Sequence, residues 1–275
     1  MAVSGYLQTS DQATIYYEVA GEGQPVVLVH GWSCSSKFYA RNVAGLQAQF
    51  QVITLDLRGH GKSSKGLQGY TLERLAQDVR ELLVYLDLHE VLLMGWSLGG
   101  PLLLAYWRQF KQDSRLAGLG LIDMTPFPMG AAPWNSHGLR EHNAEAFNGM
   151  VSALLADQQG FVDGFVKKMF PEGVQEANTQ WINAECMKLP PYIGIALYSA
   201  YAYGDFTDVL PTITVPTLVL AANSQIFPAS IEQGRQIAAQ IPQGQFVPFQ
   251  TGGHLFFYLV AEKFNQAVLT FAKSL

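Results

Sequence analysis

The sequence predicts an α/β protein with a doubly wound, mostly parallel sheet into which an all-helical segment is inserted. The first observation is the run "PVVLVHG" (25–31), which is continuously apolar, as strands covered on both faces are. The second is that such runs alternate with helix-like periods, because strands separated by helices form parallel sheets. The third is that the alternation stops between Thr125 and about Leu210, where the periodicity is helical throughout. We therefore expect residues 1–124 and 211–275 to form one core domain and residues 125–210 to form a helical insertion.

The individual elements follow from the same patterns. "TIYYEVAG" (14–21) alternates apolar and polar residues, which predicts a half-buried edge strand before the central one. Then come a helix over 38–48, the strand "QVITLDL" (51–57), a helix over 72–86, the strand "EVLLMGW" (90–96), a helix over 101–110 and the strand "LAGLGLIDM" (116–124). The insertion opens with the Pro- and Gly-rich loop "TPFPMGAAP" and closes with "PTITVP". The strand "TLVLAA" (217–222), a helix, the strand "QFVPF" (245–249) and a last helix complete the sheet.

Composition excludes several classes of function. The 275 residues carry a net charge of -5 without a basic cluster, so we expect no nucleic-acid partner. The N-terminus lacks the basic and apolar regions of a signal peptide, and no apolar stretch is long enough for a membrane span. We therefore expect a cytoplasmic protein. The two cysteines, Cys34 and Cys186, match neither a disulfide framework nor a metal-ligand pattern, and we expect no metal and no cofactor.

Residues 95–99, "GWSLG", fit the pattern G-x-S-x-G between an apolar strand and a helix. This context is typical of a nucleophile elbow, in which a tight turn lifts the serine hydroxyl out of the sheet. Side chains at Gly95 and Gly99 would collide with the neighbouring strand and helix. The motif therefore predicts Ser97 as a nucleophile.

"HGW" (30–32) ends the strand expected next to the elbow strand, at the sheet edge where such folds bind ligands. The backbone N–H groups of Trp32 and Leu98 could then point at one oxygen atom, which predicts an oxyanion hole. We interpret His30 as a scaffold residue. Near the C-terminus, "TGGHLFF" places His254 in a Gly-rich turn after the last strand, from which it could reach Ser97 as a general base. The alternative is a histidine that only caps the last helix.

These motifs together resemble the α/β-hydrolase fold family over nearly the entire chain: "HGW" (30–32), "DLRGHGKS" (56–63), "GWSLGG" (95–100) and "GGH" (252–254) stand in the family's order. The resemblance implies Ser97 as nucleophile, His254 as base and the amides of Trp32 and Leu98 as oxyanion hole. It also implies that Asp56 and Arg58 are structural and that residues 125–210 form a cap over the pocket.

The sequence departs from the family pattern at the third catalytic residue. Many members carry the acid four residues before a proline in the loop after the strand that follows the cap; here that proline is Pro228, and the position holds Ser224. Asp123, which ends the strand before the insertion, satisfies the chain order of nucleophile, acid and histidine. We expect Asp123 to be the acid. A loop-capping role for Asp123 is the alternative, with Asp205 and Asp208 as the next candidates.

These residues predict a serine hydrolase that cleaves a carboxylic ester, with thioesters or lactones also open, through an acyl-enzyme on Ser97. The substrate should be a small acyl or aromatic molecule, because aromatic residues are frequent in the cap. Four of them are predicted to line the pocket: Phe127, Trp134, Trp181 and Tyr192. Two other functions stay open: a cofactor-free dioxygenase that uses a His254–Asp123 base, and a non-catalytic ligand receptor.

Overall fold

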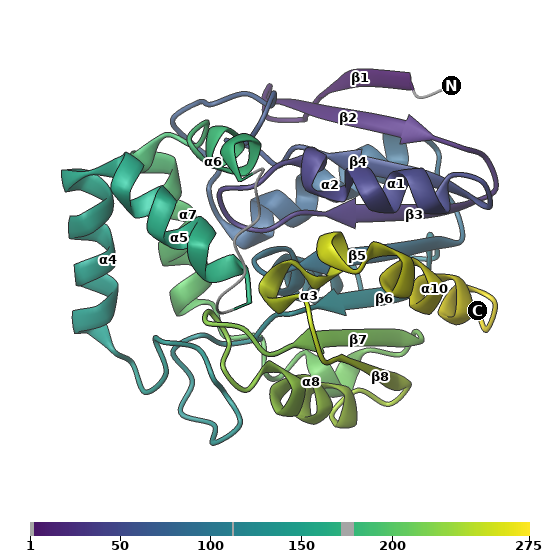
Figure 1. The fold of residues 1–275 in the computed structure, drawn as a ribbon. Coiled ribbons are helices and arrows are strands. Elements are labelled where there is room, and N and C mark those ends of the chain that lie inside the picture. The colour runs from purple at the N-terminus through teal and green to yellow at the C-terminus, as the bar shows by residue number, and fades with distance from the viewer. Residues whose placement is uncertain (1–2, 112, 172–178) are drawn as a thin grey trace.

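The computed structural model describes residues 3–111, 113–171 and 179–275, and its centre is one eight-stranded sheet (Figure 1). The strands are β1 (Val3–Gln8), β2 (Thr14–Ala20), β3 (Gln24–Val29), β4 (Phe50–Leu55), β5 (Val91–Trp96), β6 (Leu116–Ile122), β7 (Thr217–Ala222) and β8 (Gly244–Phe249). They lie in the order β1-β2-β4-β3-β5-β6-β7-β8. The pairs β1–β2 and β2–β4 are antiparallel, and all other pairs are parallel. The predicted doubly wound, mostly parallel sheet is therefore confirmed.

Helices cover both faces of the sheet. One face carries α2 (Leu72–Tyr85), α3 (Gly99–Gln109) and α8 (Ser230–Ala239), and the other carries α1 (Ala40–Leu46), the short α9 (Phe256–Leu259) and α10 (Ala261–Ala272). Residues 25–29 of β3 are apolar because both faces of this strand are covered. Val27 and Val29 belong to the core under α2 and α3, whereas Val26 and Leu28 belong to the core under α1 and α10.

The edge-strand prediction is wrong. β2, the strand of "TIYYEVAG", lies between β1 and β4, and β1 is the edge. The sequence of β1 carries little apolar signal, because most of its side chains are exposed. The burial of Ile15, Tyr16 and Tyr17 follows from the position of β2 inside the sheet.

Between β6 and β7, the described part of the insertion contains the α-helices α4 (Ala144–Ala156), α5 (Gln158–Met169), α6 (Gln180–Cys186) and α7 (Pro191–Tyr203). Figure 1 shows them gathered at one end of the sheet. The insertion is not helical throughout, because residues 125–143 form turns and loop before α4 begins. Three prolines and the helix cap at Asn143, whose side chain accepts a hydrogen bond from the Ala146 amide at 2.9 Å, explain that boundary. In the described ranges, no helix has the length and apolar character needed to cross a membrane.

Candidate active site

Ser97 occupies the sharp turn between β5 and α3. Its φ angle is +54°, a left-handed backbone conformation. Residues other than glycine rarely adopt it, and it recurs at functional sites. A Cβ atom on Gly95 would lie 2.2 Å from the Gly99 carbonyl oxygen, and one on Gly99 would lie 2.7 Å from the carbonyl oxygen of Val29. Both glycines of the motif are thus required by close backbone approach. The turn is fixed by the Ser97 amide, which donates to the Ile122 carbonyl at 2.9 Å.

The loop after β3 passes directly against the turn that carries Ser97. A Cβ atom on Gly31 would lie 2.9 Å from the Cβ atom of Ser97, so only glycine allows this approach. The next residue, Trp32, is 7% exposed, and Leu98 is 1% exposed. Neither backbone amide donates a hydrogen bond to another part of the chain that the structure describes. Because buried amides are nearly always paired, two unpaired amides beside Ser97 are what an oxyanion hole requires.

His30 and Arg58 have structural partners. The His30 Nε2 atom accepts a hydrogen bond from the Leu57 amide at 3.0 Å, so the Nδ1 atom carries the proton and donates to the Gly31 carbonyl at 2.8 Å. His30 therefore holds the loop that carries Trp32. Arg58 pairs with Asp11 and Asp78, which ties its turn to the hairpin and to α2.

The structure brings His254 and Asp123 together. His254 follows β8 in a tight turn, where Gly252 and Gly253 have φ angles of +101° and +56°. The His254 Nδ1 atom lies 2.5 Å from the Oδ2 atom of Asp123, and both side chains are buried. A carboxylate at Nδ1 fixes the tautomer in which Nδ1 carries the proton, which leaves Nε2 free to act as a base.

Asp123 is fixed by hydrogen bonds to β7, to the start of α8 and to His254. It follows β6 with a φ angle of +45°, and its own amide donates to the Leu220 carbonyl on β7 at 2.8 Å. Its Oδ1 atom accepts hydrogen bonds from the Ser230 hydroxyl at the start of α8 and from the Ala222 amide. The carboxylate is therefore oriented on one oxygen by these donors and on the other by His254.

The other candidate positions for the acid have separate structural roles. Ser224 closes its own turn, because its hydroxyl oxygen accepts a hydrogen bond from the Phe227 amide at 3.0 Å. Asp205 is exposed and bonds to Thr207, and Asp208 is exposed and pairs with Arg108 at 2.5 Å. Of these carboxylates, only that of Asp123 contacts the His254 imidazole.

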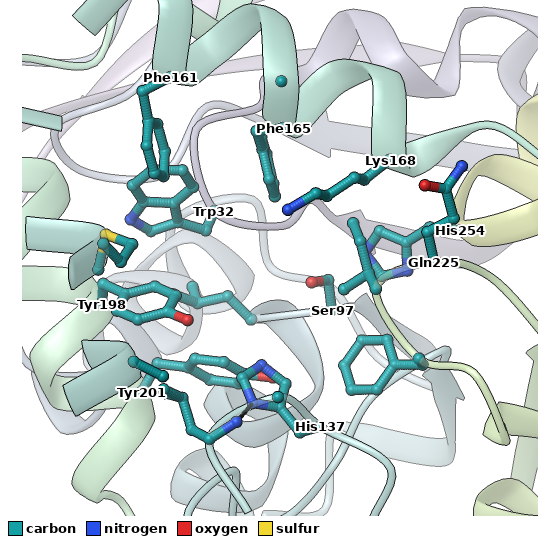
Figure 2. A pocket seen from close by; sticks show the side chains of 18 of the residues that line it. Trp32, Ser97, His137, Phe161, Phe165, Lys168, Tyr198, Tyr201, Gln225 and His254 are labelled. Atoms are coloured by element: carbon teal, nitrogen blue, oxygen red, sulfur yellow. Dashed lines mark hydrogen bonds between the residues drawn. The ribbon is translucent and has the colours of Figure 1, made fainter. Parts of the chain in front are cut away.

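Ser97, Leu98 and His254 open into a cavity of about 510 Å³ between the sheet edge and the inserted helices (Figure 2). Within the described ranges the Ser97 hydroxyl makes no hydrogen bond, so it is free to turn toward the imidazole. Catalytic contacts of this kind often tighten only when substrate binds. The wall is mainly apolar and aromatic; it includes Trp32, Met150, Phe161, Phe165, Tyr198, Tyr201 and Phe227. Among the residues with described positions, no cluster of His, Cys, Asp and Glu could hold a metal ion.

The pocket residues predicted from the sequence are wrong. None of the four lines the cavity: Phe127, Trp134, Trp181 and Tyr192. The Trp181 ring packs against Phe38 and Tyr258, at centroid distances of 5.2 and 5.6 Å. Tyr192 is 49% exposed, and the remaining two pack against buried hydrophobic clusters. A large aromatic side chain in the insertion does not by itself line the cavity. The side of its helix or loop that faces the sheet edge decides whether it does.

The residues that do line the cavity show a helical spacing. On α5, Phe161, Phe165 and Lys168 lie at positions i, i+4 and i+7, and on α7, Tyr198 and Tyr201 lie at i and i+3. Residues spaced in this way share one face of a helix. This periodicity was a usable signal in the sequence, once α5 and α7 were known to present those faces to the sheet edge.

His137, which the sequence did not single out, also lines the cavity. Its ring packs against Tyr201 and Phe227, at centroid distances of 5.5 and 5.4 Å. Burial, with a smaller effect of His254, lowers the pKa of His137 to about 4, so the ring is neutral near pH 7. Its Nδ1 atom accepts a hydrogen bond from the Leu139 amide at 3.1 Å, which leaves the proton on Nε2.

The sheet order and the position of Ser97 after β5 are those of the α/β-hydrolase fold. A model of the alpha/beta hydrolase fold matches residues 24–259, so the chain belongs to that family.

Esterases and haloperoxidases of this family are similar to the chain over almost its full length. The non-heme chloroperoxidase CPO-A1 of Kitasatospora aureofaciens is 29% identical, over 96% of this chain and 97% of its own. The bifunctional esterase/perhydrolase DCH of Acinetobacter calcoaceticus is 27% identical, over 98% of this chain and 100% of its own. The solved esterase EaEST of Exiguobacterium antarcticum has a TM-score of 0.89 and 26% identity, over 98% and 100% of the two chains.

Proposed function

We propose that this protein is a serine hydrolase of carboxylic esters that works through an acyl-enzyme on Ser97. The observation that carries the proposal is the buried His254–Asp123 pair, because His254 lines the same cavity as Ser97. Esterases among the similar proteins support it. The proposal includes residues 125–210 as a cap that selects the substrate, because α4, α5 and α7 supply much of the cavity wall.

In the proposed reaction, the Ser97 hydroxyl attacks the ester carbonyl carbon while His254 Nε2 takes its proton. The amides of Trp32 and Leu98 donate hydrogen bonds to the oxyanion that forms, and one such donor is typically worth about 2.7–4 kcal/mol. The alcohol leaves with the proton from His254. Water, deprotonated by the same imidazole, then attacks the acyl-enzyme, and the carboxylic acid leaves with Ser97 restored. Asp123 keeps Nδ1 protonated and stabilises the imidazolium in both halves.

A second candidate function uses the same acyl-enzyme. Hydrogen peroxide in place of water would release a peracid, which could oxidise a halide in solution. The observation that favours it is the presence of a perhydrolase and of non-heme haloperoxidases among the similar proteins. Perhydrolysis needs no change in the proposed residues, because only the second nucleophile differs.

Ester turnover by the purified protein and by Ser97→Ala tests the proposal. We expect wild type to hydrolyse ethyl esters of short and medium acids and Ser97→Ala to lose activity by a factor of about 10³ or more, as when a catalytic serine is removed elsewhere. Peracid formation in the presence of hydrogen peroxide should be lost in parallel. Oxygen uptake with an aromatic substrate that persists in Ser97→Ala would instead favour the dioxygenase, and binding without turnover would favour the receptor.

A further inference from the structure

Lys168 is a charged residue in an otherwise uncharged wall. It lies in the last turn of α5, three residues after Phe165, and lines the cavity. Figure 2 shows its side chain extending from α5 toward Phe165, above Ser97 in the view. No lining residue is an aspartate or glutamate, and His137 is neutral near pH 7 because its pKa is about 4. The ammonium group is therefore the permanent charge that a bound substrate would meet.

Some lysines of this chain pair with carboxylates. Lys37 and Lys188 each lie 2.6 Å from Glu185, which itself is buried. Lys168 has no such ion pair with any residue that the structure describes, although its neighbours on α5 include acidic Asp163. An unpaired cation beside an apolar cavity favours a ligand that brings the opposite charge.

From this arrangement we infer that the substrate is an ester that carries a carboxylate at the end of an apolar chain, and that Lys168 binds this carboxylate. The inference rests on the proposed ester hydrolysis, whose substrate class it specifies. The apolar part would lie between the reacting carbonyl at Ser97 and the Lys168 ammonium, against Trp32 and Phe165. A single ammonium suits a single carboxylate, whereas phosphate recognition usually involves several donors.

The size of the effect follows from the exposure of the lysine. Lys168 is solvent-accessible, and ion pairs at accessible sites are worth up to about 1 kcal/mol. We therefore expect a preference of up to about fivefold in kcat/KM, which added salt weakens. The competing explanation is that the lysine stem only covers apolar surface while its charge stays in water.

The test compares half-esters with neutral esters of the same length: monoethyl succinate, adipate and suberate against ethyl butyrate, hexanoate and octanoate. Lys168→Gln keeps most of the stem and removes the charge. It should lower the ratio of kcat/KM for the best half-ester to kcat/KM for the matched neutral ester by up to about fivefold. Lys168→Glu should reverse the preference. Lys167→Gln is the matched control, because Lys167 precedes Lys168 on α5, is exposed and does not line the cavity.

A binding measurement separates this inference from the proposed chemistry. Calorimetric titration of monoethyl adipate into Ser97→Ala and into Ser97→Ala/Lys168→Gln needs no turnover. We expect weaker binding to the double variant. Hydrolysis of neutral esters with no half-ester preference, or a preference that Lys168→Gln leaves intact, would overturn the inference and leave the esterase proposal standing. Lys168-dependent binding of the half-ester without hydrolysis of any ester would overturn the esterase proposal and leave the role of Lys168 in carboxylate binding standing.

Discussion

His254 Nδ1 and Asp123 Oδ2 lie 2.5 Å apart, which joins the turn after β8 to the end of β6 across the intervening strand β7. The sequence has Ser224 where many members of the family carry the acid, and in the proposed function Asp123 takes that role. The end of β7 donates the Ala222 amide to Asp123, and α8 donates the Ser230 hydroxyl. The loop that holds Ser224 is thus followed by a residue, Ser230, that orients the proposed acid.

Asp123→Asn should cripple ester hydrolysis without unfolding the protein. An amide can bond the imidazole, but it favours the wrong tautomer and cannot stabilise the imidazolium. The same substitution in a serine protease lowers kcat by about 10⁴, a magnitude we borrow here and that corresponds to roughly 5 kcal/mol. Stopped-flow or long-time assays of purified protein, with circular dichroism to verify folding, measure the loss. A folded Asp123→Asn variant with near-normal kcat would place the acid elsewhere, with Asp205 and Asp208 tested next.

Ser230→Ala should lower kcat about tenfold with little change in KM, because the Asp123 carboxylate loses the hydrogen bond from the Ser230 hydroxyl. A hydrogen bond to a charged group is typically worth about 1.5–3 kcal/mol. Ser230→Thr keeps the hydroxyl and should restore most of the rate. Steady-state kinetics of both variants make the comparison. Equal rates for Ser230→Ala and wild type would show that the hydroxyl does not position the acid.

Acid should destabilise the protein partly through His137. Its pKa is about 4 in the folded protein, against 6.5 for an unperturbed histidine, so the unfolded chain binds the extra proton between these pH values. The free energy of unfolding should therefore fall as the pH drops from 6.5 to 4, with a contribution from this residue of up to about 3 kcal/mol. Burial also lowers the pKa values of His30 and His60, which adds to the fall.

Urea titrations of wild type and His137→Asn across this pH range isolate the residue. Asparagine can still accept the hydrogen bond from the Leu139 amide. The variant should lose less stability on acidification than wild type does. Parallel curves for the two proteins would show that His137 does not titrate with a lowered pKa.

Phe165→Ala should shift the acyl-chain preference toward longer esters, because the ring lines the cavity and packs 5.2 Å from the Trp32 ring. Removing the ring enlarges the space for long acyl chains and weakens the contacts with short acyl chains. Trp134→Ala is the control, since that side chain lies outside the cavity. The measurement is the ratio of kcat/KM for ethyl octanoate and ethyl butyrate. An unchanged ratio in Phe165→Ala would show that Phe165 does not determine the acyl-chain preference.

Residues at the ends of strands could be predicted from the sequence. Ser97, Asp123 and His254 each follow a strand marked by an apolar run or a Gly-rich turn, and parallel strands bring their carboxyl ends to one edge. The structure places all three there, with His254 bonded to Asp123. The glycine-dependent approach of the Gly31 loop to Ser97 follows from the same motifs.

The cavity wall could not be predicted in the same way. Its residues depend on how each inserted helix is rotated against the sheet, and that rotation is set by packing between segments far apart in sequence. Trp181 is large and aromatic but packs against Phe38, whereas Lys168 is charged and lines the cavity. Side-chain size and polarity therefore gave the wrong selection, and the spacing along α5 and α7 was the better signal.

The covalent labelling of Ser97 tests the central claim most directly. Wild-type protein incubated with a fluorophosphonate should gain the mass of one adduct, and peptide mapping should place it on Ser97. Ser97→Ala should gain none, and Asp123→Asn should react more slowly because its imidazole is a poorer base in the wrong tautomer. The account would be contradicted if folded, wild-type protein stayed unlabelled, or if Ser97→Ala were labelled at the same rate.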